Sequence, residues 1–140
     1  HLSLRRQRQM CIRDSQKTMH IFEEHPTREE FLDLLWRETI NSPMQEDWID
    51  NSISASQKAP DGPFGDIGPV LERLLSLGAS KRDLSLVYRM ASYEAVFETL
   101  YKINDPGINP DEAAMLFEDL LSSDPSGLEA GPGSAPEKNV

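Results

Sequence analysis

Four short polar motifs that start helices divide this sequence, and they constrain its fold more than any other feature. Thr27-Arg-Glu-Glu30 and Ser42-Pro-Met-Gln45 are capping boxes, whose hydroxyl and Glu or Gln side chains satisfy free backbone N–H groups of a first helical turn. Ser80 and Asn109 stand at two further helix starts. Apolar residues recur every three or four positions after these motifs, and no sustained strand alternation occurs. The sequence therefore predicts an all-α fold.

The spacing of these motifs predicts about five helices in a single compact domain, built around a long central helix over residues 81–103. The first three turns of that helix carry apolar residues almost all round, which indicates burial. Asp66 is the expected cap of the third helix and Gly78 its end. The other expected helices cover residues 27–40, 42–56, 66–77 and 109–121, with a Pro- and Gly-rich loop at 57–65.

The two ends of the chain differ in composition from its middle. The segment from Leu4 to Ser15 resembles translated sequencing-adapter sequence, and it holds four of the chain's 14 basic residues but only one of its 24 acidic ones. Residues 124–140 are rich in Pro and Gly and have few large apolar groups to offset their ordering entropy. We expect a non-native or disordered extension at 1–18, a helical domain at 19–123 and a disordered tail at 124–140.

Charge and cysteine content exclude several classes of function. The formal net charge of -10 repels phosphate backbones and anionic lipid headgroups, so a basic or apolar protein partner is favoured and nucleic acid is not. Cys11 is the only cysteine, which excludes an intramolecular disulfide, a thiolate zinc cluster and a Cys-x-x-Cys pair. No apolar run is long enough to span a bilayer, and residues 1–15 lack the apolar run of a signal peptide. We expect no membrane association and a cytoplasmic location, and the oligomeric state stays open.

Motifs for catalysis and cofactor binding are lacking. The sequence contains no Gly-x-Ser-x-Gly elbow, no phosphate-binding Gly-x-x-x-x-Gly-Lys-Ser/Thr loop and no Gly-x-Gly-x-x-Gly fingerprint. His20 and His25 are five residues apart, which does not place two imidazoles on one helical face. The sequence therefore predicts no cofactor and no metal site, and it favours a protein that is not an enzyme.

Two carboxylates on the long helix are the main candidates for chemistry. If Glu94 and Glu98 faced the interior beside Tyr88, Arg89 or Tyr101, their pKa values would be raised, which is the condition for acid catalysis. An enzyme or small-molecule binder centred on Glu94, Tyr88 and Arg89 is therefore one alternative. The simpler interpretation is an ion pair between Glu98 and Lys102 on successive turns, together with a hydrogen bond to a tyrosine.

The aromatic residues allow two interpretations. They can line a ligand pocket or a partner groove, or they can supply the buried area of a small domain. Core packing is favoured, with Trp48 partly exposed on a thinly apolar second helix. The aromatic set comprises Trp36, Trp48, Tyr88, Tyr93, Phe97 and Tyr101.

The stretch from Leu74 to Val87 resembles a helix-turn-helix motif. Gly78 occupies the turn, and Leu84 and Val87 stand where that family packs its recognition helix. The resemblance implies DNA reading through Lys81 and Arg82. It departs from the family at Leu74, where a small residue is common, and its second helix is unusually apolar.

The function that the sequence favours is a small, acidic, non-enzymatic interaction or regulatory protein, similar to inhibitor or immunity proteins. An enzyme or ligand binder and a DNA reader remain the alternatives. The candidate binding residues are Glu94, Glu98, Tyr88, Arg89, Tyr101 and Trp48.

Overall fold

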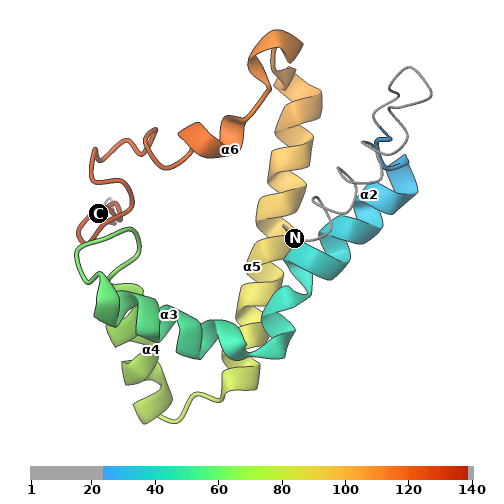
Figure 1. Cartoon of the computed structure of the whole chain (residues 1–140). Coiled ribbons are helices and arrows are strands. Elements are labelled where there is room, and N and C mark those ends of the chain that lie inside the picture. The colour runs from blue at the N-terminus through green and yellow to red at the C-terminus, as the bar shows by residue number, and fades with distance from the viewer. Residues whose placement is uncertain (1–23, 139–140) are drawn as a thin grey trace, which may run out of the picture. The chain divides into compact units, whose positions relative to one another are not determined.

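The computed structural model describes residues 24–138, and it contains helices and turns but no strand within that range (Figure 1). The all-α class is therefore confirmed. By its contacts the chain divides into two units, one ending at Asp33 and one beginning at Leu34. The α-helices are α2 (Arg28–Leu35), α3 (Asp47–Lys58), α4 (Ile67–Ser76), α5 (Lys81–Lys102) and α6 (Leu116–Asp119). Shorter turns are η1 (Trp36–Ile40), η2 (Ser42–Gln45), η3 (Ile103–Gly107) and η4 (Pro110–Glu112).

Two of the expected helix starts have the local geometry that the sequence predicts. The Glu30 N–H donates to Thr27 Oγ1 at 3.2 Å, and the Thr27 N–H donates to Glu30 Oε2 at 3.3 Å, which completes the capping box. Ser80 Oγ accepts the Asp83 N–H at 3.0 Å and caps α5. The long helix is confirmed, and Gly78 ends the preceding helix region with a φ of 101°.

The capping box predicted at Ser42 is wrong. Ser42 Oγ instead donates to the Thr39 carbonyl at 3.2 Å, so the hydroxyl binds the preceding turn. Residues 42–45 form the short 3-10 turn η2, and Glu46 then takes a left-handed conformation with a φ of 68°. α3 begins only at Asp47 and carries the half-buried Trp48, whose partial exposure matches the sequence expectation.

The helix predicted over residues 109–121 is reduced to two pieces. Asn109 Oδ1 accepts the Asp111 N–H at 3.1 Å, but η4 ends at Glu112. Met115 has a left-handed backbone with a φ of 59°, and α6 covers only four residues after it. A short helix without a packing partner is marginal in water, and α6 is not among the elements that pack closely together.

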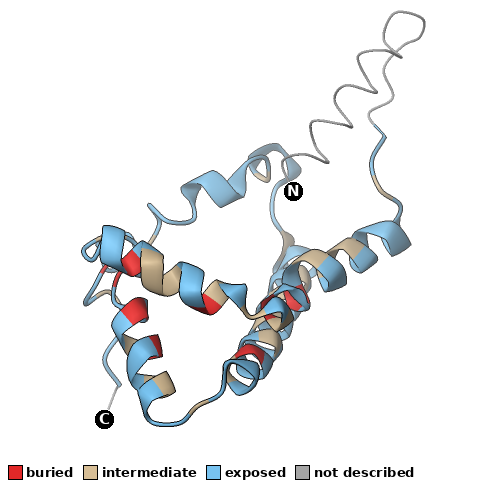
Figure 2. Ribbon diagram, turned by 60° about the horizontal axis from the view of Figure 1, so that its bottom comes forward, coloured by how far each residue is buried: buried red, intermediate tan, exposed pale blue. Residues whose placement is uncertain are grey.

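The main packing contacts join α3 to α4 and join α5 to η1 and η2 (Figure 1). Ser56 Oγ accepts the Gly68 N–H at 2.9 Å within the buried α3–α4 contact. A Cβ atom added at Gly68 would stand 2.5 Å from the Ser56 Cβ, so these two small residues set the close approach of the helices. Buried residues lie on α3, on α4 and where α5 meets η1 and η2 (Figure 2).

The burial predicted for α5 is wrong. Ser85 is its one buried residue, and Val87 and Met90 are 63% and 62% exposed. The reason is that the main packing partners of α5, the segments η1, η2 and η3, are four or five residues long and are too short to cover a helix of 22 residues on every side. The core helix expected after Thr27 is likewise exposed at Phe31 and Trp36, and Ile40 is its buried residue.

Residues 124–138 form turns without a helix. The Asp124 carboxylate accepts hydrogen bonds from the Ala130 N–H at 2.7 Å, from Ser126 Oγ at 2.7 Å and from the Ser126 N–H at 3.0 Å. These bonds, the one from Ala130 foremost, hold the pKa of Asp124 below its ordinary value. The mobility predicted for this tail stays a prediction, and the predictions for residues 1–18 and His20 lie outside the described residues.

Candidate interaction surface on α5

The outer face of α5 carries a continuous row of large apolar side chains. Its members recur every three or four residues, so they share one side of the helix. Tyr93 is the least exposed at 41%, and Met90 is the most exposed at 62%. The rings of Tyr93 and Phe97 stack 6.2 Å apart, and those of Phe97 and Tyr101 stack 6.3 Å apart. We call this row the α5 stripe: Leu86, Met90, Tyr93, Phe97 and Tyr101.

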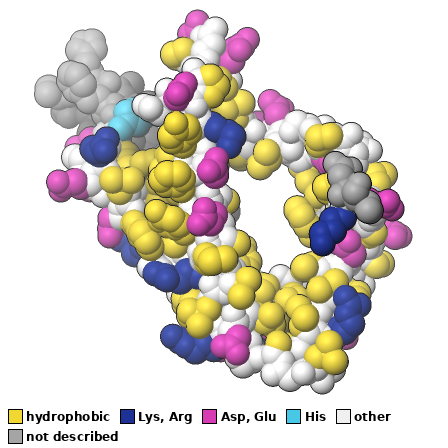
Figure 3. All heavy atoms as spheres, turned by 180° about the vertical axis from the view of Figure 1, so that it is seen from behind, with side chains coloured by type: hydrophobic (Ala, Val, Ile, Leu, Met, Phe, Trp, Pro, Cys, Tyr) yellow, Lys and Arg dark blue, Asp and Glu magenta, His cyan; other side chains and the backbone are white. Residues whose placement is uncertain are grey.

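One edge of the α5 stripe is acidic. Glu94 follows Met90 by four residues and Glu98 follows Glu94 by four, which places both carboxylates along the same side of the row. Glu94 is exposed, and Glu98 Oε2 accepts a hydrogen bond from Lys102 Nζ at 2.9 Å. The space-filling view shows hydrophobic side chains in a column along this helix with acidic side chains beside them (Figure 3).

The other edge is closed by packed groups. The Trp36 ring lies 5.7 Å from the Tyr93 ring, and the Arg89 guanidinium lies 5.9 Å from the Trp36 ring centre. Arg89 Nε also donates to Asn41 Oδ1 at 2.7 Å. This edge therefore presents an aromatic surface whose neighbouring cation already has partners.

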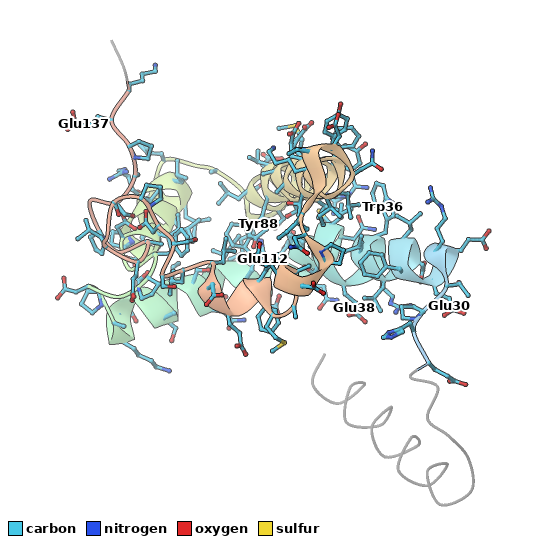
Figure 4. All side chains as sticks on the ribbon, turned by 90° about the horizontal axis from the view of Figure 1, so that it is seen from above. Glu30, Trp36, Glu38, Tyr88, Glu112 and Glu137 are labelled. Carbon is cyan, nitrogen blue, oxygen red and sulfur yellow. The ribbon has the colours of Figure 1, made fainter. Side chains whose placement is uncertain are left out.

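A different face of α5 holds the helix to α3. The Trp48 indole N–H donates to Ser85 Oγ at 2.9 Å, and the Tyr88 ring meets the Trp48 ring edge-on at 4.8 Å. Lys81 Nζ lies 3.0 Å from Asp50 Oδ2. Tyr88 projects from α5 toward α3, whereas Trp36 projects from η1 toward α5 (Figure 4). These contacts fix α5 and leave the α5 stripe outside.

The structure separates Glu94, Tyr88 and Arg89, the three residues proposed as the centre of an enzyme or ligand site. Tyr88 binds the α3 side and Arg89 binds Asn41, whereas Glu94 stands exposed on the acidic edge. Helical residues five or six apart point in directions more than about 100° different, so neither side chain faces Glu94. The alternative that requires a semi-buried Glu94 is contradicted, because the helix turns this residue toward solvent. The ion pair predicted between Glu98 and Lys102 is confirmed.

The core packing favoured for the aromatic residues is wrong for part of the set. Tyr93, Phe97 and Tyr101 are 41%, 50% and 56% exposed. The spacing of these residues predicts their shared face but not its exposure to water. The only sequence signal for exposure is the acidic pair Glu94 and Glu98 beside the row, because carboxylates are rarely buried without partners.

The geometry does not support the helix-turn-helix resemblance. α4 packs on α3, whereas α5 packs on η1 and η2, so the two helices of the resemblance do not form the close pair that the motif needs. Val87, expected to pack the recognition helix, is 63% exposed. Lys81, expected to face DNA, pairs with Asp50.

Comparisons with protein-family models, with curated proteins and with solved structures give no match to this chain. Within residues 24–138, no three His, Cys, Asp or Glu side chains are grouped closely enough to hold a metal ion. No helix of this range has the length and apolar character needed to cross a bilayer.

Proposed function

We propose that the protein is a non-enzymatic interaction protein whose α5 stripe binds an amphipathic helix of a partner protein. The partner helix carries Lys or Arg along one edge of its apolar face. The observation that supports this proposal is an exposed row of five large apolar side chains with Glu94 and Glu98 along one edge. A contiguous apolar patch with a polar rim is typical of interaction sites on proteins.

The size of the row favours a helix as the occupant. Each half-exposed side chain gains roughly 1 kcal/mol when its remaining apolar surface leaves water. Association costs about 4–15 kcal/mol of lost free motion, so several of these side chains must be covered together. A helix that lies along α5 reaches all of them, with anchors spaced by three and four residues.

The charge of the edge favours a basic occupant. A Lys or Arg that meets Glu94 forms a complementary pair, whereas an acidic residue there is repelled. The net charge of -10 acts in the same direction over longer distances and opposes nucleic acid and anionic membranes as occupants. Because the other edge is closed by Trp36 and Arg89, the basic residues of the partner are expected on one side only. A regulatory role of the inhibitor or immunity type, in the cytoplasm, is compatible with this mode of binding.

Selection from a randomised library of helical peptides against the full chain tests the proposal. We expect enriched peptides to carry apolar residues at three- and four-residue spacing with Lys or Arg along one edge. Phe97→Ser should weaken binding of these peptides about tenfold, because it removes a central aromatic anchor. Glu94→Lys should shift the selected edge residues from basic to acidic.

Two matched variants keep this test specific. Leu77→Ser removes an exposed apolar side chain at the end of α4, and Glu72→Lys makes the same charge change on α4. Both should leave the enriched sequences unchanged. Equal loss of binding in Leu77→Ser and Phe97→Ser, or enrichment without a preference for basic residues, would contradict the proposal.

A further inference from the structure

Residues 113–121 form a second unpartnered apolar segment, distant in sequence from the α5 stripe. Phe117 and Leu120 are 63% and 73% exposed, and Leu116 and Leu121 are 47% and 38% exposed. The structure has one helical turn here, α6, which follows the left-handed Met115. Four large apolar side chains within six residues are therefore each more than a third exposed beside a single helical turn.

The same segment would form an amphipathic helix if its backbone were continuous. Over residues 113–121, helical spacing gathers Leu116, Phe117 and Leu120 with Leu121 on one face, and it leaves Glu118 and Asp119 on the other. Asn109 and Pro110 already form a helix-start motif, and Asn109 Oδ1 already accepts the Asp111 N–H. The segment therefore holds the pattern and the cap of a helix, and it lacks a surface against which to fold.

The charge around this segment has one sign. No Lys or Arg occurs between Lys102 and Lys138, whereas Asp111, Glu112, Glu118, Asp119 and Asp124 lie on and beside the segment. A groove with an acidic rim would repel it, and a groove with a basic rim would attract it. Charge complementarity therefore favours a groove with a basic rim as the binding site for this segment.

We propose that residues 113–121 are a docking segment that completes a helix when it binds an apolar groove with a basic rim on another protein. Leu116, Phe117 and Leu120 enter the groove, and Glu118 and Asp119 meet its rim. In this interaction the chain supplies the helix, whereas in the interaction of the α5 stripe it supplies the surface. The inference does not rest on the α5 stripe, and it survives if that proposal fails.

The test titrates the full isotope-labelled chain with a designed helical bundle that presents a leucine-lined groove edged by lysines. A second bundle, identical except for glutamates at the edge, is the control probe. We expect binding to the lysine-edged bundle only, with NMR Cα shifts of residues 113–121 moving to helical values. Phe117→Ser should weaken this binding about tenfold, and Glu118→Pro should weaken it at least as much because it blocks the helix.

Phe97→Ser should leave binding of the lysine-edged bundle unchanged, which separates this test from that of the α5 stripe. Each variant alters an exposed side chain, and unchanged amide shifts of Ile49 and Ser85 would show that the packed residues are intact. Unchanged shifts of residues 113–121 at saturation, or equal binding of the two bundles, would overturn the inference. A dimer of the chain that dissociates on Phe117→Ser substitution would also overturn it, because the groove would then belong to a second copy of this chain.

Discussion

The contact between α3 and α4 and the outer face of α5 are both built from apolar helical faces, yet one is closed and the other open. In the first, Ser56 and Gly68 bring two helices close enough for a buried hydrogen bond of 2.9 Å. In the second, Met90 and Phe97 are 62% and 50% exposed on a helix whose main packing partners are the short segments η1, η2 and η3. The difference lies in the chain that follows each helix. The turn at 59–66 returns α4 onto α3, whereas only the short segments η3, η4 and α6 follow α5 within the described residues.

This comparison shows that apolar spacing fixes which residues share a face but not whether the face is covered. The closed contact has the small residues Ser56 and Gly68 where its helices approach, whereas the open face carries large side chains that are mostly half-exposed. Substitutions in the closed contact should therefore change the free energy of unfolding, and substitutions on the open face should change binding.

The largest effect is expected for Gly68→Ala. The added methyl group would stand 2.5 Å from the Ser56 Cβ, so the helices must separate or distort, which costs about 1–3 kcal/mol. This cost exceeds the gain of about 1 kcal/mol that alanine normally gives in a helix. Urea unfolding followed by circular dichroism measures the difference.

A double-mutant cycle supplies the control for Gly68→Ala. Ser56→Gly removes the side chain that the new methyl group meets, so Gly68→Ala should cost much less in that background. An equal cost in both backgrounds would mean that the contact between the two small residues is not what limits the approach of α3 to α4.

A smaller effect is expected where α5 is held to α3. Trp48→Phe keeps an aromatic ring beside Tyr88 but removes the donor to the fully buried Ser85 hydroxyl, at a cost of about 1 kcal/mol. Ser85→Ala should cost less in the Trp48→Phe background than alone, because the hydrogen bond is already lost. Thermal unfolding of the four proteins measures both values, and strict additivity would contradict the assignment.

Substitutions in the α5 stripe should have little effect on the free energy of unfolding. Met90→Ser and Phe97→Ser should each change the free energy of unfolding by no more than about 0.5 kcal/mol, since both side chains already face water. The same urea titration measures this. A loss as large as that of Gly68→Ala would show that the stripe is covered in the isolated protein.

Local features of this fold can be predicted from the sequence. The caps at Thr27 and Ser80 and the helix end at Gly78 were predictable because each depends on a few neighbouring residues. Ser42 has the same local pattern, but its hydroxyl donates to the Thr39 carbonyl instead of capping a helix. The capping pattern does not show that this carbonyl competes for the hydroxyl. The acidic edge beside the α5 stripe was visible in the sequence, whereas the exposure of Phe97 depends on which elements pack on α5, which local spacing does not determine.

The smallest effect is a pH dependence at the turn held by Asp124. Because hydrogen bonds lower the pKa of the folded carboxyl, their stabilisation is complete above the ordinary value of 3.8 and is lost as the pH falls through the lower folded-state pKa. NMR amide shifts of Ser126 and Ala130 should therefore change only in that acidic range. Asp124→Asn should abolish this titration, and a change near neutral pH would contradict the assignment.

The hydrogen bond from the Phe64 N–H to the Ala130 carbonyl, 2.7 Å long, has a consequence for the chain between α5 and that point. It makes residues 103–129 a loop with both ends attached, rather than a tail with one free end. Closing a loop removes part of the conformational entropy of the residues inside it. A partner that orders residues 113–121 therefore has less conformational entropy to remove than it would from a free tail. Cleavage of the chain at one end of this loop should weaken binding of the partner even if the contacts in the interface stay the same.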